Sequence, residues 1–155
     1  MNNVILLVED SSSDEKLTLV AFRRSGVPHE MVVARDGADA LDYLERRGKY
    51  ADRDPGARPA LILLDLKLPR VGGLEVLRRV REDPRTRMIP IVILTASKEE
   101  ADVARAYSLG ANGYVHKPVD FGEFAEGAKT LAQFWLRWNE QPPAGRGSDG
   151  VAPPA

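Results

Sequence analysis

Residues 61–69 read LILLDLKLP, and this stretch decides the fold. Its first four residues are apolar without polar alternation, as in a strand that is buried on both faces of a sheet. Such a strand belongs to a parallel sheet with helices on both sides. Five short apolar runs, each too short for a typical helix, follow one another along the chain. They are Val4–Val8, Met31–Ala34, Ala60–Leu64, Ile91–Leu94 and Gly113–Val115.

Amphipathic stretches separate these runs and show apolar residues at helical spacing, as at Leu74, Leu77 and Val80. We expect helices at Asp14–Ser25, Ala38–Arg47, Leu74–Glu82, Lys98–Leu109 and Asp120–Trp138. Strands that alternate with helices predict an α/β protein with a doubly wound parallel sheet. Five such units fit the flavodoxin-like strand order 2-1-3-4-5, here with an extended last helix.

The chain of 155 residues has the length of about one domain, which we place at residues 1–140. Gly48 to Pro59 is polar and is expected to form a surface loop. Residues 141–155 are rich in Pro and Gly and have no periodic apolar positions. They are expected to form a disordered tail.

Composition excludes several classes of function. The formal net charge is −1, so no global field attracts nucleic acid or anionic lipid. The chain has no cysteine, which excludes disulfides, thiolate zinc sites and a cysteine nucleophile. The apolar run at Val4–Val8 is too short to span a membrane and has no basic leader before it. We therefore expect a cytoplasmic protein without nucleic acid or membrane partners.

Polar side chains follow four of the predicted strands. Glu9 and Asp10 follow the first strand, Asp65 the third, Thr95 the fourth and Lys117 the fifth. The carboxyl ends of parallel strands meet at one edge of the sheet, where ligands of such folds bind. Each acid alone is more simply a helix cap. Agreement at four strand ends favours a site.

Three converging carboxylates would repel one another unless a cation neutralised them. Mg²⁺ is the natural cation, because it prefers oxygen ligands and no cluster of cysteine or histidine competes for the assignment. Lys117 and the Thr95 hydroxyl could hold the oxygens of a phosphoryl group. Asp65 ends the central run alone and is the best candidate for a nucleophile that forms an aspartyl phosphate.

These residues stand in blocks that resemble the receiver domain of two-component response regulators. The blocks are 5–10 (ILLVED), 63–69 (LLDLKLP) with Gly73, 93–96 (ILTA), 110–111 (GA) and 114–118 (YVHKP). The resemblance covers about Asn3 to Trp138, and all blocks appear in order. No folded domain is expected after Trp138, so the chain is most similar to single-domain regulators.

The resemblance implies roles for the site residues. Asp65 would be the phosphoacceptor, and Thr95 and Lys117 would contact the phosphoryl group. The metal would be held by Glu9, Asp10, Asp65 and the Lys67 backbone carbonyl. Glu9 stands where many members have Asp, which lengthens one arm of the metal site.

The resemblance also implies a switch and a geometric detail. Tyr114 would be the aromatic switch, whose ring turns inward as Thr95 moves. The bond between Lys117 and Pro118 would be cis, although only about 5–6% of X–Pro bonds are cis.

The implied function is that of a signalling switch. A sensor histidine kinase would supply the phosphoryl group in a Mg²⁺-dependent reaction, and the added charge would change an interaction surface. Such a protein is not an enzyme beyond its own phosphorylation and dephosphorylation. The alternative is a constitutive protein–protein adaptor with a vestigial acidic site.

Three aromatic residues, Phe134, Trp135 and Trp138, lie at the end of the last predicted helix. A nineteen-residue helix is longer than a five-residue strand, so its final turns should overhang the sheet. Exposed clustered aromatics mark an interface, and we expect a homodimer through this helix. Alternatively, the three side chains cap the core of their own domain. The long loop before the third strand and the ending FWLRWNE (134–140) resemble regulators that partner bacterial phytochromes, which suggests a light-sensing kinase.

Overall fold

Five parallel strands form one sheet in the order β2-β1-β3-β4-β5 in the computed structural model, which describes residues 3–54 and 57–143. The strands are β1 Val4–Val8, β2 Glu30–Ala34, β3 Leu61–Leu64, β4 Ile91–Thr95 and β5 Gly113–His116. The predicted fold class and strand order are confirmed. The strand bounds differ from the predicted runs by one residue at most.

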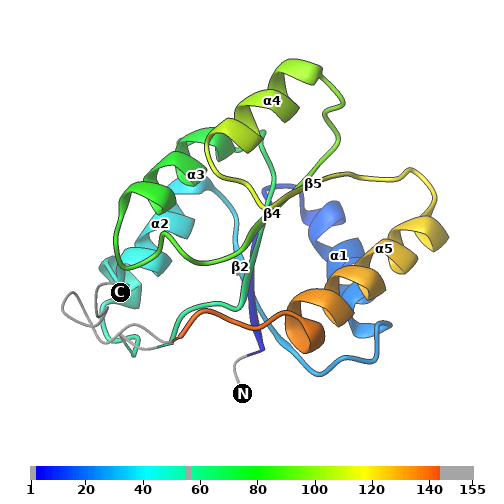
Figure 1. Cartoon of the computed structure of the whole chain (residues 1–155), viewed down its shortest axis with the longest axis horizontal. Helices are drawn as coiled ribbons and strands as arrows, with labels where there is room; N and C mark the ends of the chain where they lie inside the picture. Colours follow the sequence, from blue (N-terminus) through cyan, green and yellow to red (C-terminus); the bar gives the residue numbers. More distant parts are fainter. Residues whose placement is uncertain (1–2, 55–56, 144–155) are drawn as a thin grey trace.

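Helices cover both faces of the sheet. They are α1 Ser12–Arg23, α2 Gly37–Glu45, α3 Gly73–Glu82, α4 Glu100–Ser108 and α5 Phe121–Gln133. Figure 1 shows α2, α3 and α4 on one side of the strands and α1 and α5 on the other. The connection from α2 to β3, predicted as a plain loop, contains the 3₁₀ turn η1 at Gly48–Tyr50.

The two layers of helices enclose two apolar cores, and each buried strand alternates between them. In β1, Leu6 and Val8 belong to the core beneath α2, α3 and α4, whereas Ile5 and Leu7 belong to the core beneath α1 and α5. Successive side chains of a strand point to opposite faces, so a continuous apolar run fills both cores.

The last helix departs from its prediction at the C-terminal end. After Gln133 the chain continues as the π-helical segment η2, Phe134–Trp138. Leu136 is 1% exposed, and Trp135 packs against the core beneath α1 and α5. The final turn therefore does not simply overhang the sheet, because it closes one end of this core. Phe134 and Trp138 remain 49% and 81% exposed.

The predicted tail lies mostly outside the described residues, which end at Pro143. The Pro143 carbonyl accepts a hydrogen bond from Arg58 Nη2 at 2.6 Å, so the chain beyond η2 returns to the loop before β3. Among the described residues, no helix has the length and apolar character that crossing a membrane requires.

Candidate functional site

Backbone hydrogen bonds continue past the ends of the strands and place the predicted residues at one edge. The Glu9 N–H donates to the Ala34 carbonyl at 2.9 Å, and the Asp65 N–H donates to the Val8 carbonyl at 3.1 Å. The Lys117 N–H donates to the Thr95 carbonyl at 2.8 Å. The site is therefore held by the hydrogen bonds of the sheet, and regular elements position side chains more precisely than loops do.

Gly73 lets the chain fold back directly after Asp65. A Cβ at Gly73 would lie 2.2 Å from the Asp65 carbonyl oxygen and 2.6 Å from Leu66 Cα. The Gly73 N–H donates to the Leu66 carbonyl at 3.0 Å. Only glycine fits this close approach of two backbones, so the glycine in the sequence pattern holds the loop after β3 at the site.

Both oxygens of the Asp65 carboxylate are held by predicted site residues. Thr95 Oγ1 donates to Oδ1 at 2.9 Å, and Lys117 Nζ donates to Oδ2 at 3.1 Å. The Lys67 N–H also donates to Oδ1, at 3.2 Å. Asp65 is only 8% exposed and Thr95 only 1%, so this carboxylate lies in a largely desolvated, oriented setting.

Three carboxylates come together beside Asp65 as predicted. One oxygen each from Glu9, Asp10 and Asp65 lies within 4.8 Å of the others. Glu9 is 2% exposed, and its Oε2 accepts the Ser11 N–H at 3.2 Å. A set made only of carboxylate oxygens suits a hard divalent cation such as Mg²⁺.

Lys117 supplies the positive charge among these acids. Its Nζ donates to Glu9 Oε1 at 2.5 Å and to Asp14 Oδ2 at 3.0 Å, in addition to Asp65. Burial by itself would lower the pKa of Lys117, but the hydrogen bond to Glu9 and the charges of Asp65 and Glu9 outweigh it, so the pKa is raised. Burial raises the pKa of Glu9 despite its bond to Lys117. Lys117 is therefore a permanent cation at neutral pH.

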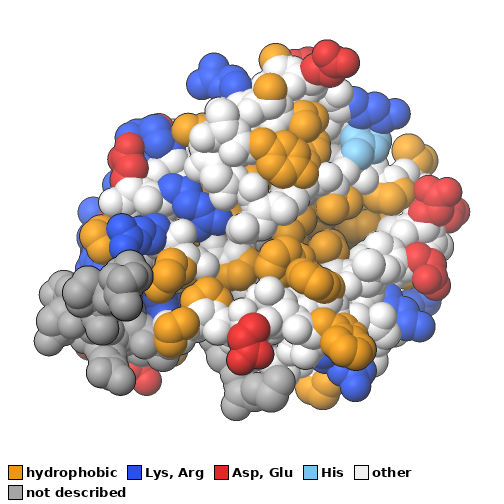
Figure 2. All heavy atoms as spheres, viewed as in Figure 1, with side chains coloured by type: hydrophobic (Ala, Val, Ile, Leu, Met, Phe, Trp, Pro, Cys, Tyr) orange, Lys and Arg blue, Asp and Glu red, His pale blue; other side chains and the backbone are white. Residues whose placement is uncertain are grey.

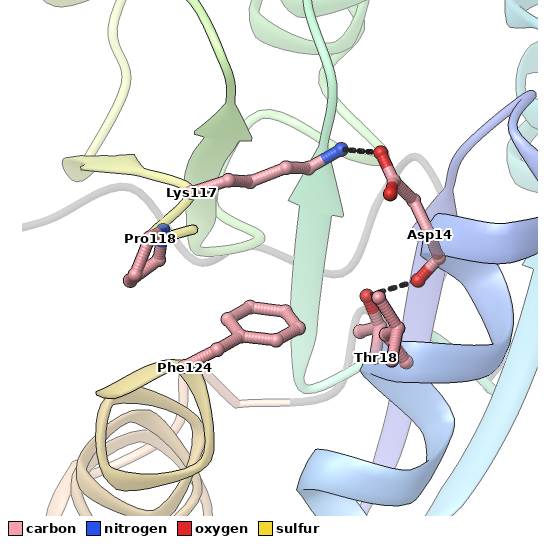
Figure 3. Close-up of a pocket in the computed structure, with 6 residues that line it drawn as sticks. Asp14, Thr18, Lys117, Pro118 and Phe124 are labelled. Atoms are coloured by element: carbon pink, nitrogen blue, oxygen red, sulfur yellow. Dashed lines mark hydrogen bonds and ion pairs between the residues drawn. The ribbon is translucent and has the colours of Figure 1, made fainter. Parts of the chain in front are cut away.

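Asp14 is the site residue that sequence reasoning missed. It appeared there only as the first residue of a predicted helix. The signal that could have found it is its position in the first turn of the helix that directly follows Glu9 and Asp10, because this turn starts at the same edge of the sheet. Figure 3 shows the Lys117 side chain extending toward α1, with its nitrogen meeting the Asp14 carboxylate.

The predicted switch residue Tyr114 is half-buried on β5 and packs against the core beneath α2, α3 and α4. Its hydroxyl donates to the Ser97 carbonyl at 3.0 Å. The Ser97 N–H in turn lies 3.4 Å from Thr95 Oγ1. Ser97, which sequence reasoning also missed, thus links the ring of Tyr114 to the hydroxyl that touches Asp65.

One detail of the sequence interpretation is wrong. The bond between Lys117 and Pro118 is trans, not cis. Trans is the lower-energy isomer of most X–Pro bonds, and Lys117 reaches all three carboxylates from it.

The turn after β2 carries Asp36, which has two roles. Asp36 Oδ1 accepts the Asp39 N–H at 2.7 Å and caps α2. The same carboxylate accepts two hydrogen bonds from Arg70, at 2.9 and 3.0 Å. This pair ties the loop after β2 to the loop that follows Asp65, a contact between distant residues that turn composition does not reveal.

A doubly wound sheet of this order, with an acidic cluster, a threonine and a lysine at the carboxyl ends of its strands, is the architecture of a receiver domain. The sequence profile of the response regulator receiver domain matches residues 5–129. The chain therefore belongs to the response regulator receiver domain family.

Similar proteins include regulators linked to phytochromes. Response regulator Rcp1 from Synechocystis sp. is 39% identical over 133 residues, which are 86% of this chain and 88% of Rcp1. The phosphorylated cyanobacterial phytochrome response regulator RcpA superposes with a TM-score of 0.85 at 39% identity, over 92% of this chain and 100% of that structure. The bacteriophytochrome response regulator RtBRR is 54% identical, with a TM-score of 0.75 and coverage of 92% and 86%.

Proposed function

We propose that this chain is a response regulator that accepts a phosphoryl group from a histidine kinase on Asp65 and thereby switches an interaction surface. The observation that carries the proposal is the setting of Asp65. One of its oxygens is held by the Thr95 hydroxyl and the other by the Lys117 ammonium, beside the acid pair Glu9 and Asp10. The relatives RcpA, as a phosphorylated phytochrome regulator, and RtBRR support this function.

The proposed reaction is a transfer between two side chains. An Asp65 oxygen attacks the phosphorus of a phosphohistidine on the kinase, a P–O bond forms and the P–N bond breaks. The imidazole nitrogen keeps the electron pair and takes a proton. Lys117 and Thr95 are placed to hold phosphoryl oxygens during the transfer, and water later hydrolyses the acyl phosphate. In this proposal the protein catalyses nothing beyond its own phosphorylation and dephosphorylation.

Mg²⁺ is the proposed cofactor. The residues that would hold it are Glu9, Asp10, Asp65 and the backbone carbonyl of Lys67, and the carboxylate oxygens are already grouped. When bound, Mg²⁺ would offset the charge of the carboxylates and of the phosphoryl oxygens. A structure of the Mn²⁺-bound form of Rcp1, 38% identical with a TM-score of 0.83 over 91% of this chain and 99% of that one, supports a divalent cation.

The test is exposure of the protein to acetyl phosphate and Mg²⁺, followed by intact mass measurement. We expect one phosphoryl adduct in the wild-type protein and none in Asp65→Asn. A wild-type protein without an adduct would favour the constitutive adaptor, and an adduct that persists in Asp65→Asn would misplace the phosphoacceptor. Omission of Mg²⁺ should abolish the adduct.

The proposed phosphodonor is a sensor histidine kinase of the phytochrome type. The support is the similarity to RcpA and RtBRR, which are described as phytochrome and bacteriophytochrome response regulators. Such a kinase takes its phosphoryl group from ATP, so the proposal places the regulator in the cytoplasm. Transfer from a phosphorylated phytochrome kinase at a rate well above that from an unrelated kinase would support the assignment.

The proposed interaction surface lies at the end of the last helix. Figure 2 shows hydrophobic side chains gathered on the face between α4 and α5. Phe134 and Trp138 are the most exposed aromatics of α5 and η2, whereas Trp135 is half-buried and supports the fold. We propose a homodimer through the end of the last helix, with the exposed Phe134 and Trp138 at the contact.

Sedimentation tests the dimer directly. The wild-type protein should dimerise at micromolar concentration, and Phe134→Ala with Trp138→Ala should shift it to monomer. A wild-type protein that stays monomeric at high micromolar concentration contradicts the homodimer. Trp135→Ala is the contrasting variant. It should lower the free energy of unfolding, because Trp135 packs against the core, whereas the variants of the exposed Phe134 and Trp138 should not.

A further inference from the structure

Lys117 distributes its hydrogen bonds over three separate carboxylates. The Nζ–O distances are 2.5 Å to Glu9, 3.0 Å to Asp14 and 3.1 Å to Asp65. An ammonium group has three N–H donors, so each carboxylate can take one of them. With two donors held by Glu9 and Asp14, the third is directed at Asp65.

Asp14 is held on a rigid support. Its N–H is capped by Ser11 Oγ at 3.2 Å, and its carbonyl accepts the Thr18 hydroxyl at 2.7 Å (Figure 3). Both bonds lie within or next to the first turn of α1, which packs against α5. The backbone that carries this carboxylate is therefore fixed relative to the sheet edge.

Asp14 differs from the other two partners of Lys117. Among the described residues, the acids grouped closely enough to hold a metal ion are Glu9, Asp10 and Asp65. Asp14 is not part of this group. The Asp14 side chain is 42% exposed, against 2% for Glu9 and 11% for Asp65, so it stands at the rim of the site. Asp14 thus remains available to Lys117 when Glu9 and Asp65 bind other groups.

We propose that Asp14 is a positioning residue for phosphoryl transfer. It keeps the Lys117 ammonium at the site and directs its third N–H toward Asp65 and the phosphoryl oxygens that replace it as acceptor. With Glu9 turned to the metal and this carboxylate absent, Lys117 would keep no anchor besides Asp65. This inference rests on the proposed function, because it assumes that Asp65 receives the phosphoryl group.

Two variants separate positioning from electrostatics. Asp14→Asn keeps an oxygen acceptor at the same place and removes the charge, whereas Asp14→Ala removes both. Both variants lose the favourable charge at the start of α1 equally, so a difference between them does not come from the helix dipole. A purely electrostatic role would make both variants faster to the same extent, because each removes one negative charge that repels the anionic phosphodonor.

The kinetic experiment follows phosphorylation by acetyl phosphate with saturating Mg²⁺, by intact mass. We expect the maximal rate of Asp14→Ala to fall about tenfold, the effect of one hydrogen bond to a charged group, with the half-saturating concentration little changed. Asp14→Asn should stay within about threefold of the wild type. Equal rates in both variants, whether unchanged, faster or slower, would overturn the inference.

A second readout does not depend on activity. NMR detects the ¹H–¹⁵N signal of the Lys117 ammonium, which is assigned by its loss in Lys117→Met. In the wild type and in Asp14→Asn, its protons should be protected from exchange with water. It should broaden or vanish in Asp14→Ala. A protected signal in Asp14→Ala would overturn the inference and leave the proposed function intact, whereas a wild-type protein that forms no adduct overturns both.

Discussion

Two half-buried cations, Lys117 at the carboxyl edge of the sheet and Arg81 at its amino edge, bind oxygens of opposite kinds. At the carboxyl edge, Lys117 binds three carboxylates. At the amino edge, Arg81 at the end of α3 binds four neutral oxygens at 2.8–2.9 Å. These belong to the carbonyls of Gly110, Arg87 and Ile89 and to the side-chain amide of Asn112.

The hydrogen bonds of Arg81 are permanent, whereas the partners of Lys117 can exchange it for a divalent cation. The oxygens around Arg81 carry no net charge, so this group does not attract a second cation as a cluster of carboxylates does, and Arg81 joins the loops before β4 and β5 permanently. Burial, with no charge to offset it, lowers the pKa of Arg81. The carboxylates around Lys117 are ligands that a divalent cation can take over. The same kind of cation thus stabilises one edge and keeps the other ready to change.

Removal of Lys117 should have the largest effect on stability. Lys117→Met leaves the buried Glu9 carboxylate without its counter-charge, and we expect a loss of about 3 kcal/mol in the free energy of unfolding without Mg²⁺. Mg²⁺ at 100 times its Kd should return about 2.7 kcal/mol. Urea denaturation with and without Mg²⁺ measures both values. If Mg²⁺ did not restore the free energy of unfolding of Lys117→Met, a divalent cation could not take the place of Lys117 among these carboxylates.

Removal of Arg81 should cost slightly less and should resist rescue. Arg81→Ala leaves several loop carbonyls to find water, and we expect a loss of about 2 kcal/mol. Mg²⁺ should raise the free energy of unfolding of Arg81→Ala by no more than it raises that of the wild type. Arg81→Lys is the matched control, since it keeps the charge but loses the planar fork of donors. Greater rescue by Mg²⁺ in Arg81→Ala than in the wild type would show that the two edges are not independent.

Gly110 sharpens the comparison within the amino edge. Its φ is +104°, and a Cβ there would lie 3.0 Å from Arg81 Nε. Gly110→Ala should therefore cost about 1.5 kcal/mol through strain and through displacement of the guanidinium. In the Arg81→Ala background only the strain remains, so the cost should shrink. Equal costs in both backgrounds, measured by urea denaturation, would mean that Arg81 simply moves aside.

The smallest effect concerns the pair of Asp36 and Arg70 at the carboxyl edge. The hydrogen bond from Arg70 lowers the pKa of Asp36 below its value in the unfolded chain. The pair therefore adds stability above the unfolded pKa of about 3.9 and loses it as the pH falls through the folded pKa. Asp36→Asn keeps the helix cap, so only the charge pair is lost.

We expect Asp36→Asn to lower the Tm by about 2 °C at pH 7. The difference from the wild type should shrink as the pH falls below the unfolded pKa and through the lowered folded pKa of Asp36. Thermal melts across this pH range measure the effect. A difference that persists unchanged at low pH would assign it to the cap and not to the ion pair.

Much of the fold could be predicted because the signals are local. Apolar runs such as Leu61–Leu64 identified buried parallel strands, and the residue after each strand identified the site edge. The positions where helices end relative to the core could be predicted less well. The last turn at Phe134–Trp138 was expected to overhang, but Leu136 and Trp135 close the core beneath α1 and α5. The spacing of apolar residues shows which face of a helix is apolar. It does not show how far along the helix the core extends.

The sequence by itself determined the parallel sheet and the five residues that follow its strands, whereas the strand order was taken from the fold class and confirmed by the structure. Periodicity and position after a strand are properties of the chain, so no coordinates were needed for them. Only the tertiary structure decided the partners: Asp14 for Lys117, Ser97 for Tyr114, Arg70 for Asp36 and the trans bond before Pro118. Hydrogen bonds between distant segments depend on distances of a few tenths of an ångström, which packing sets and a linear pattern does not contain.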